Sequence, residues 1–303
     1  MTSPATGPSG AVTVLVGGHE SAAGQHLLPW VVGGHAFRAV GTGRALAEAV
    51  EEALARPGPP GQPVCVVPVT LGRDPRLVAD TARTLDWLAP AAGPGRIALT
   101  EPFGTGDHLV GWLRAAAARD HAAGPGGALL VTAPAAGPFD DAELFRLARL
   151  VRQYGRHRWV EVAFDGGDPG IDEGIERCRR LGAERVLLVP AAFGPAYPGA
   201  DTGNGADAGT RAGTELTEGG PLLTRQAASG VLRARVAAAL HRLGHGDDGI
   251  AAGLDAEHGH GYAHSHSPGA GHSHDTGTGA HTGTGHSHGG GYSPRAGHRR
   301  IHE

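Results

Sequence analysis

Residues 159–190 read WVEVAFDGGDPGIDEGIERCRRLGAERVLLVP, and this stretch decides the fold class. Trp159–Phe164 is a short run of β-branched and aromatic residues, which is typical of a strand. Ile171–Leu181 places its apolar residues at helical spacing, and Arg185–Pro190 has the pattern of a second, buried strand. A strand, a helix and a strand joined by short turns predict a βαβ unit, which forms part of a parallel sheet.

The same alternation extends upstream of this unit. Ala128–Thr132 and Asp140–Tyr154 have the patterns of a strand and a helix, so a C-terminal copy begins near residue 127. Residues 11–121 repeat the order. In that segment the predicted strands are Ala11–Val16, Phe37–Gly41, Pro63–Val69 and Arg96–Thr100, and the predicted helices are Arg44–Ala55, Leu77–Leu88 and Leu109–Ala118.

The third predicted strand of each copy ends in Val-Pro, which indicates an internal duplication. We therefore predict an α/β protein of two βαβ repeats with parallel sheets, as an N-terminal domain over 11–121 and a C-terminal domain over 127–244. The Gly/Asp/Thr-rich insert Gly199–Gly220 has no convincing strand pattern. The C-terminal copy is therefore predicted to lack a fourth strand and to end in a helix at Leu222–Leu243.

Residues 245–303 have no apolar periodicity and consist mainly of Gly, His, Ser and Thr. Such a segment cannot offset its ordering entropy, so we predict a disordered tail. Paired imidazoles chelate Ni²⁺, Co²⁺, Zn²⁺ and Cu²⁺, so the tail is a metal reservoir or delivery arm, or else a low-complexity extension that binds metal incidentally. Its His-x-His pairs are His258/His260, His264/His266, His272/His274 and His286/His288.

Composition excludes several classes of function. All 26 basic residues are Arg, which excludes a Schiff-base lysine and a P-loop lysine. The net charge of −4 gives no general attraction for nucleic acid, and no nucleotide site is predicted. The two cysteines belong to no CxxC pair, so no iron–sulfur cluster is expected and both are predicted to be buried thiols. Neither a secretory signal nor a membrane-spanning run is present, so we expect a cytoplasmic protein without a membrane partner.

The first predicted strand runs into Gly17-Gly18-His19-Glu20-Ser21, which puts a histidine just past its carboxyl end. Ligands bind at that edge of an open parallel sheet. This loop resembles the Gly-His-Gly-Ser loop of the sirohydrochlorin chelatases of the CbiX/SirB type, a family that includes cobaltochelatases and whose loop histidine holds the metal. The strand VEVAF, a helix ending in Gly-Ala and a strand ending in Pro within residues 160–190 are similar to the core unit of that family. The resemblance covers about residues 11–245.

This sequence departs from the family pattern at two points. Glu20 replaces the glycine after the histidine, and the loop after the third strand reads Gly72-Arg73-Asp74-Pro75-Arg76 where the family has a second histidine. The corresponding loops of the C-terminal copy have no histidine either, so only the N-terminal copy is expected to hold a metal. The resemblance implies a divalent metal as substrate, Co²⁺ or else Fe²⁺ or Ni²⁺, and a sirohydrochlorin-type tetrapyrrole as partner.

Insertion of a metal into a tetrapyrrole requires a ligand with open positions and a base for two pyrrole protons. We predict His19 as metal ligand and catalytic group, with Glu20 as proton acceptor or second ligand. Asp74 and Glu101 are the other candidate metal ligands, because carboxylate oxygens also bind such ions. Arg73 and Arg76 are predicted to bind the substrate carboxylates in bidentate fashion.

Structural alternatives stand beside these assignments. His19 and Glu20 are also compatible with polar loop residues, and Asp74 with the N-cap of the helix that follows. Glu101 is compatible with a structural role, and the two arginines with surface charges. Two functions follow from the sequence: a sirohydrochlorin chelatase in cobalamin or sirohaem biosynthesis, or a catalytically degenerate chelatase-like protein that stores metal on its His-rich tail.

Overall fold

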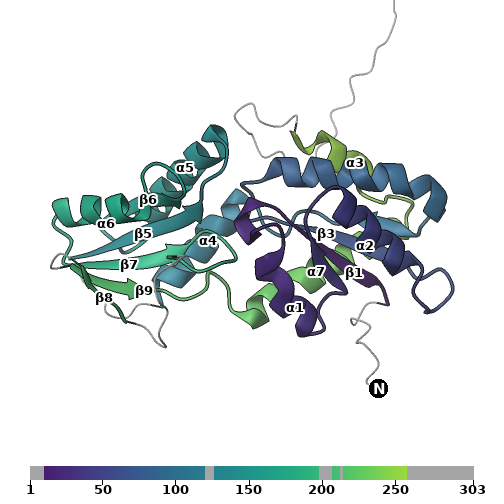
Figure 1. Ribbon diagram of the computed structural model, residues 1–303, viewed down its shortest axis with the longest axis horizontal. Helices are drawn as coiled ribbons and strands as arrows, with labels where there is room; N and C mark the ends of the chain where they lie inside the picture. The colour runs from purple at the N-terminus through teal and green to yellow at the C-terminus, as the bar shows by residue number, and fades with distance from the viewer. Residues whose placement is uncertain (1–9, 120–125, 198–206, 212–213, 258–303) are drawn as a thin grey trace, which may run out of the picture. The chain divides into compact units, whose positions relative to one another are not determined.

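The computed structural model describes residues 10–119, 126–197, 207–211 and 214–257, all within one compact unit of the chain. Its N-terminal half contains a four-stranded parallel sheet in the order β2-β1-β3-β4 (Figure 1). The strands are β1 (Val12–Gly17), β2 (Arg38–Val40), β3 (Val64–Val69) and β4 (Ile97–Leu99). Most residues of β1 and all residues of β3 are buried, because helices cover both faces of the sheet.

The second sheet repeats this order as β6-β5-β7-β9, with one further strand, β8, at its edge. Its parallel strands are β5 (Gly127–Pro134), β6 (Trp159–Asp165), β7 (Arg185–Pro190) and β9 (Thr214–Glu218), and β8 (Asp207–Arg211) pairs antiparallel to β9. The α/β class with two parallel βαβ repeats is therefore confirmed. The absence of a fourth strand in the C-terminal copy was a wrong prediction, because β9 occupies that place beside β7.

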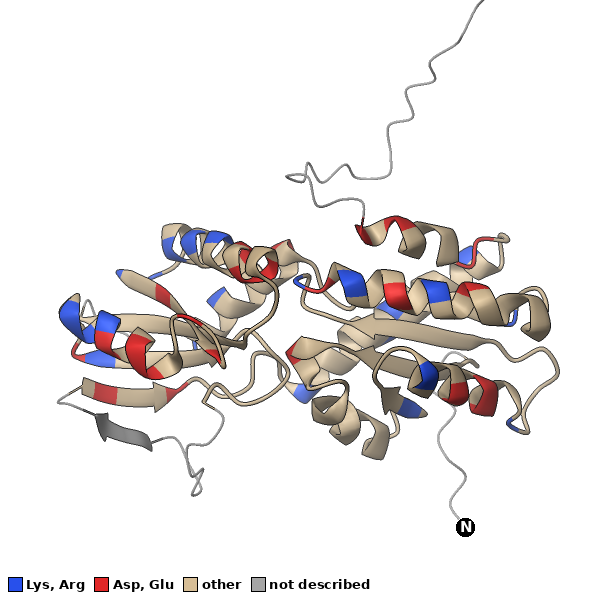
Figure 2. Cartoon of the chain, turned by 45° about the horizontal axis from the view of Figure 1, so that its top comes forward, with Lys and Arg blue, Asp and Glu red and all other residues tan. Residues whose placement is uncertain are grey.

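The helices are α1 (Leu28–Val32), α2 (Arg44–Leu54), α3 (Pro75–Ala92), α4 (Gly106–Ala117), α5 (Pro138–Tyr154), α6 (Ile171–Arg180), α7 (Arg225–Leu243) and α8 (Ile250–Leu254), with short 3₁₀ turns η1 (His19–Ser21), η2 (Gln25–Leu27) and η3 (Asp255–Glu257). The helices α3, α4 and α5 begin a few residues before their predicted starts, whereas α2, α6 and α7 are slightly shorter than predicted. Acidic and basic residues both occur along α2, α3, α5 and α6, whereas β1, β3 and β4 contain no charged residue (Figure 2).

The last helix of each copy packs on the sheet of the other copy. Leu109 and Leu113 of α4 lie in one core with Leu129 of β5 and Leu144 of α5. Conversely, α7 buries Leu232, Val236 and two alanines against β1 and β3. The predicted boundaries at 121 and 127 therefore separate the two sheets, but they do not separate the helices that cover them.

Helical structure continues beyond the predicted start of the tail at 245. Helix α8 and η3 lie in residues 250–257, and Ile250 joins the buried core between α3 and the first sheet. The tail prediction is wrong for these residues. The remainder, 258–303, with the predicted disorder and the His-x-His pairs, lies outside the described residues.

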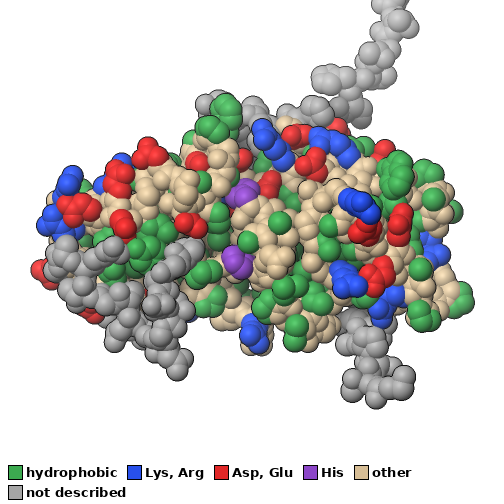
Figure 3. Space-filling model, in the orientation of Figure 1, with side chains coloured by type: hydrophobic (Ala, Val, Ile, Leu, Met, Phe, Trp, Pro, Cys, Tyr) green, Lys and Arg blue, Asp and Glu red, His purple; other side chains and the backbone are tan. Residues whose placement is uncertain are grey.

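The remaining features are the burial of the cysteines, the length of the helices and the charges at the surface. Cys65 and Cys178 are both buried, as predicted, and burial raises the pKa of each thiol to about 12. Within the described ranges, no helix has the length and apolar character needed to cross a membrane. On the face drawn in Figure 3, acidic and basic side chains are mixed, and histidine side chains reach the surface.

Candidate active site

The candidate site lies where β1 and β3 end side by side. These strands pair in parallel from Val12–Val64 to Gly17–Val69, so the loops that follow them meet at one edge of the sheet. Gly18 has no side chain, and a Cβ atom there would lie 2.0 Å from Oδ2 of Asp74. The glycine is therefore needed for a close approach between the two loops, which brings His19 to Asp74.

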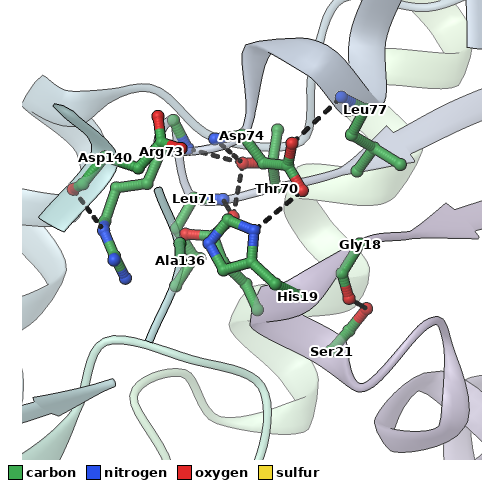
Figure 4. Close-up of polar contacts among 12 residues, drawn as sticks. Gly18, His19, Ser21, Thr70, Leu71, Arg73, Asp74, Leu77, Ala136 and Asp140 are labelled. Carbon is green, nitrogen blue, oxygen red and sulfur yellow. Dashed lines mark hydrogen bonds and ion pairs between the residues drawn. The ribbon is translucent and has the colours of Figure 1, made fainter. Parts of the chain in front are cut away.

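Asp74 has two roles in the structure (Figure 4). Its Oδ1 accepts a hydrogen bond from the backbone N–H of Leu77 at 3.0 Å, which caps α3. Its Oδ2 lies 3.0 Å from Nδ1 of His19. The N-cap alternative is thus confirmed, and the second oxygen orients the imidazole. The carboxylate thus contacts Nδ1 and leaves Nε2 for a ligand. Carboxylates contact metal-binding histidines in the same way.

The other nitrogen of His19, Nε2, is buried and has no hydrogen-bond partner among the described residues. The side chain as a whole remains 22% exposed, so the ring is not enclosed. Burial lowers the pKa of His19, but the hydrogen bond to Asp74 and the charges of Glu20 and Asp74 outweigh it, so the pKa is raised. Burial alone would raise the pKa of Asp74, but its bond to His19 holds that pKa below the usual value.

Glu20 lies on the same 3₁₀ turn and is almost fully buried. Its Oε2 accepts hydrogen bonds from the Thr70 hydroxyl and, at 2.8 Å, from the Leu71 N–H. Its Oε1 has no partner within the described chain. Burial raises the pKa of Glu20, and the charge of Arg73 and the Thr70 hydrogen bond only partly oppose that rise. A buried carboxylate with one unpaired oxygen is not the solvated loop residue of the structural alternative.

Arg73 does not reach the surface. Its Nε donates to the carbonyl of Asp140 at 3.3 Å, and Nη2 donates to Oδ1 of Asp141 at 3.2 Å, while its side chain is fully buried. Its guanidinium thus binds groups of the second copy rather than lying open to substrate carboxylates, which corrects the predicted role. Its Nη1 has no partner among the described residues.

The remaining two predicted residues form ion pairs outside the cluster of His19, Glu20 and Asp74. Arg76 is exposed, and its Nε lies 3.8 Å from Glu257. Glu101 forms ion pairs with Arg235 and Arg242 of α7. Over the described ranges, no group of three or more His, Cys, Asp or Glu side chains is arranged to hold a metal ion. The predicted set of His19, Asp74 and Glu101 is therefore not assembled, because Glu101 pairs with α7.

Two residues that sequence reasoning missed organise this site. The Thr70 hydroxyl, besides donating to Glu20, accepts from the N–H groups of Gly72 and Asp74 at 3.1 and 3.2 Å. Asp141 accepts from the N–H of Ala136 at 3.1 Å and from Arg73. Signals for both exist in the sequence: a Thr directly after a buried strand favours such a turn, and an acidic residue in the first turn of a helix favours binding to cations.

Besides the Asp141 side chain, the C-terminal copy contributes a backbone contact to the site. The loops after β5 and β7 contain no histidine. The N–H of Phe193, in the loop after β7, donates to the carbonyl of Glu20 at 2.9 Å. His19, Glu20 and Asp74 thus all come from the N-terminal copy, and contacts from the C-terminal copy hold their loops in place.

Two of the similarities found among known proteins concern chelatases. No protein-family model matches the chain. Over 54 residues the chain is 39% identical to a sirohydrochlorin cobaltochelatase of Priestia megaterium, a match that spans 18% of each protein. A multi-domain protein of Deinococcus radiodurans, described as structurally similar to chelatases with two additional novel domains, matches 75% of this chain with a TM-score of 0.43 and 20% identity. The chain covers 55% of that protein.

Proposed function

We propose that this chain is a metal chelatase that inserts a divalent metal, with Co²⁺ favoured over Fe²⁺ and Ni²⁺, into a sirohydrochlorin-type tetrapyrrole of cobalamin or sirohaem biosynthesis. One observation carries the proposal: the buried, unpartnered Nε2 of His19 at the carboxyl edge of a parallel sheet, with Nδ1 held by an ionised carboxylate. The short match to a sirohydrochlorin cobaltochelatase supports the substrate class.

The hydrogen bond to Asp74 gives His19 the electronic state that this chemistry needs. An ionised Asp74 is satisfied when Nδ1 carries the proton, which leaves a lone pair on Nε2. That lone pair serves as a ligand for the metal or as the acceptor for one pyrrole proton. The raised pKa of His19 favours proton acceptance at neutral pH.

Glu20 is proposed as the second proton acceptor. Metal insertion releases two protons from the macrocycle, and the neighbouring His19 and Glu20 provide two acceptors. The raised pKa of Glu20 brings it closer to the operating pH, where a carboxylate exchanges protons most effectively. Its unpartnered Oε1 is the atom available for that exchange, since Oε2 is bound to Thr70 and Leu71.

The substrate carboxylates need cationic partners at the mouth of the site. Arg76 lies in the first turn of α3, two residues after Asp74, and its guanidinium is exposed. We assign carboxylate binding to Arg76. Arg73 instead stabilises the ionised form of Glu20 and ties the loop after β3 to the start of α5.

The direct test is anaerobic incubation of the full chain with sirohydrochlorin and Co²⁺, followed by absorbance. We expect a rate above that of metal and tetrapyrrole alone, loss of that excess in His19→Ala, and retention in His108→Ala, which removes an exposed histidine of α4. A wild-type rate equal to the uncatalysed control, or a His19→Ala variant as fast as its parent, would refute the proposal.

The storage alternative rests on the His-x-His pairs after residue 257 and makes the opposite prediction. In a full-length variant with every histidine from His258 to His302 replaced by serine, a chelatase keeps its turnover at saturating Co²⁺. A storage protein loses its metal capacity in the same variant and shows no turnover in either form. Equilibrium dialysis beside the absorbance assay distinguishes the two.

A further inference from the structure

A pair of histidines stands at the C-terminal end of α7, on a part of the chain with no role in the site above. His241 lies in the last turn of the helix, and His245 follows one turn later. The N–H of His245 donates to the carbonyl of Arg242 at 2.8 Å, which continues the helical path past Leu243. Residues four positions apart on such a path are neighbours, and both histidines are exposed.

The separation of the two rings fits a shared metal ion. Their centroids lie 4.8 Å apart, with the ring planes at 73°. An imidazole nitrogen binds such metals at about 2.0–2.1 Å, so two rings on one ion at angles of about 90–109° have centroids about 4.5–5.1 Å apart. The observed spacing therefore already matches that of two ligands on one ion, and exposed side chains can turn their nitrogens toward it.

The electrostatic surroundings favour a cation at this position. The C-terminal end of the 19-residue α7 carries the negative end of its helix dipole. The neighbouring guanidinium of Arg242 is paired with acids, because its Nη1 lies 3.7 Å from Glu101 and its Nε lies 3.5 Å from Asp247. Its positive charge is thus balanced by the two carboxylates and opposes a bound metal only weakly.

We propose that His241 and His245 form a second metal site, which takes a divalent ion of borderline softness such as Ni²⁺, Co²⁺, Cu²⁺ or Zn²⁺. Two imidazoles are suited to this class of ion, whereas Mg²⁺ and Ca²⁺ require oxygen ligands. No third His, Cys, Asp or Glu completes a cluster here within the part of the chain described. The ion thus keeps open coordination positions, which suits exchangeable binding. The proposal does not depend on chelatase activity.

The test is residue-resolved protection of histidines from carbethoxylation in the full chain, with Ni²⁺ alone as the probe. Because the chain has no lysine, cleavage after arginine places His241 on the peptide 236–242, and further cleavage at Asp247 separates His245 from the tail. We expect Ni²⁺ to protect both histidines with a common midpoint, while His108, an exposed single histidine, stays reactive.

Single variants decide whether the two rings act together. In His241→Gln, the midpoint for protection of His245 should rise by about tenfold or more, because one imidazole replaces a chelating pair. His245→Gln should have the same effect on His241, and His108→Gln should leave both midpoints unchanged. If Ni²⁺ leaves either histidine reactive, or if each stays protected at the original midpoint without the other, the site does not exist.

Discussion

Asp74 binds His19 with one carboxylate oxygen while it caps α3 with the other. The contact from Oδ2 to Nδ1 and the contact from Oδ1 to the N–H of Leu77 are both 3.0 Å. The orientation of the imidazole is therefore fixed to the start of a long helix rather than to a free loop. The helix N-terminus also favours the ionised carboxylate, which in turn favours a proton on Nδ1.

Asp74→Asn should separate these two roles. Asparagine caps helices about as well as aspartate, so the free energy of unfolding should fall by no more than about 1 kcal/mol. Without the negative charge, the pKa of His19 should fall, and metal insertion should drop by about 10–100-fold, as for other carboxylates that orient a ligating histidine. An NMR titration of the His19 ring measures the first effect. An unchanged titration would show that Asp74 does not set the state of the ring.

Glu20→Gln should change how stability depends on pH. The pKa of Glu20 is raised in the folded chain, so its contribution to stability is full below the unfolded value of 4.5 and is lost as the pH rises through the folded pKa. The wild-type free energy of unfolding should therefore decline over that window relative to Glu20→Gln. Urea unfolding of both proteins between pH 4 and pH 8 measures the difference. A constant difference across this range would mean that Glu20 titrates normally.

His19 adds a second decline at higher pH. Because its folded pKa is raised above 6.5, its contribution is complete below that value and disappears as the pH rises through the folded pKa. His19→Gln should remove this part of the profile and leave the part due to Glu20. The same unfolding series detects it, and a profile identical to wild type above pH 6.5 would contradict the raised pKa.

Arg73→Met should be the most destabilising of these changes. It leaves the buried carboxylate of Glu20 without its cation and Asp141 without its ion pair, and removal of one partner from a buried pair costs about 3–5 kcal/mol. Adding Glu20→Gln should recover at least about 1 kcal/mol, because the unpaired charge is gone. A double-mutant cycle in urea gives the coupling energy. Arg76→Gln, at an exposed arginine, is the control and should change stability by less than about 0.5 kcal/mol.

Gly18→Ala should damage the site through sterics alone. The new methyl group would lie 2.0 Å from Oδ2 of Asp74 and would force that oxygen away from His19. We expect a loss of metal insertion comparable to that of Asp74→Asn. The matched control is Gly111→Ala in α4, where the added Cβ meets no atom within 4 Å and should stabilise the helix by about 1 kcal/mol. Full activity in Gly18→Ala would show that the contact is dispensable.

Most of the fold could be predicted because its strands are continuous apolar runs separated by amphipathic helices. Strand β9 could not, since Thr214–Glu218 reads TELTE, and only two of its residues are buried. The positions of α4 and α7 could not be predicted either, because an apolar stripe shows that one face of a helix is buried but not which sheet it covers. Apolar periodicity did not predict α8 either, because its five residues are too few to show a helical pattern.

The site was predictable where topology alone decides contact. His19 and Asp74 both follow predicted strands of a parallel sheet, so both were expected at its carboxyl edge, and the pairing of β1 with β3 brings them together. Glu101 follows the next strand, β4, but it forms ion pairs with arginines of α7. No local sequence pattern predicts these partners. Arg73 was predicted to bind substrate carboxylates, but it is buried and pairs with Asp141, a residue of the other copy that no local sequence pattern identifies.

The reciprocal placement of α4 and α7 predicts that the duplicated halves do not fold fully when they are separated. A chain severed between residues 119 and 126 would yield two fragments, each of which carries a helix that packs on the other's sheet. Such fragments should stay insoluble alone and regain structure when mixed. Gene fission at this point would thus create an obligate heterodimer, with the histidine on one polypeptide and the aspartate that anchors Arg73 on the other.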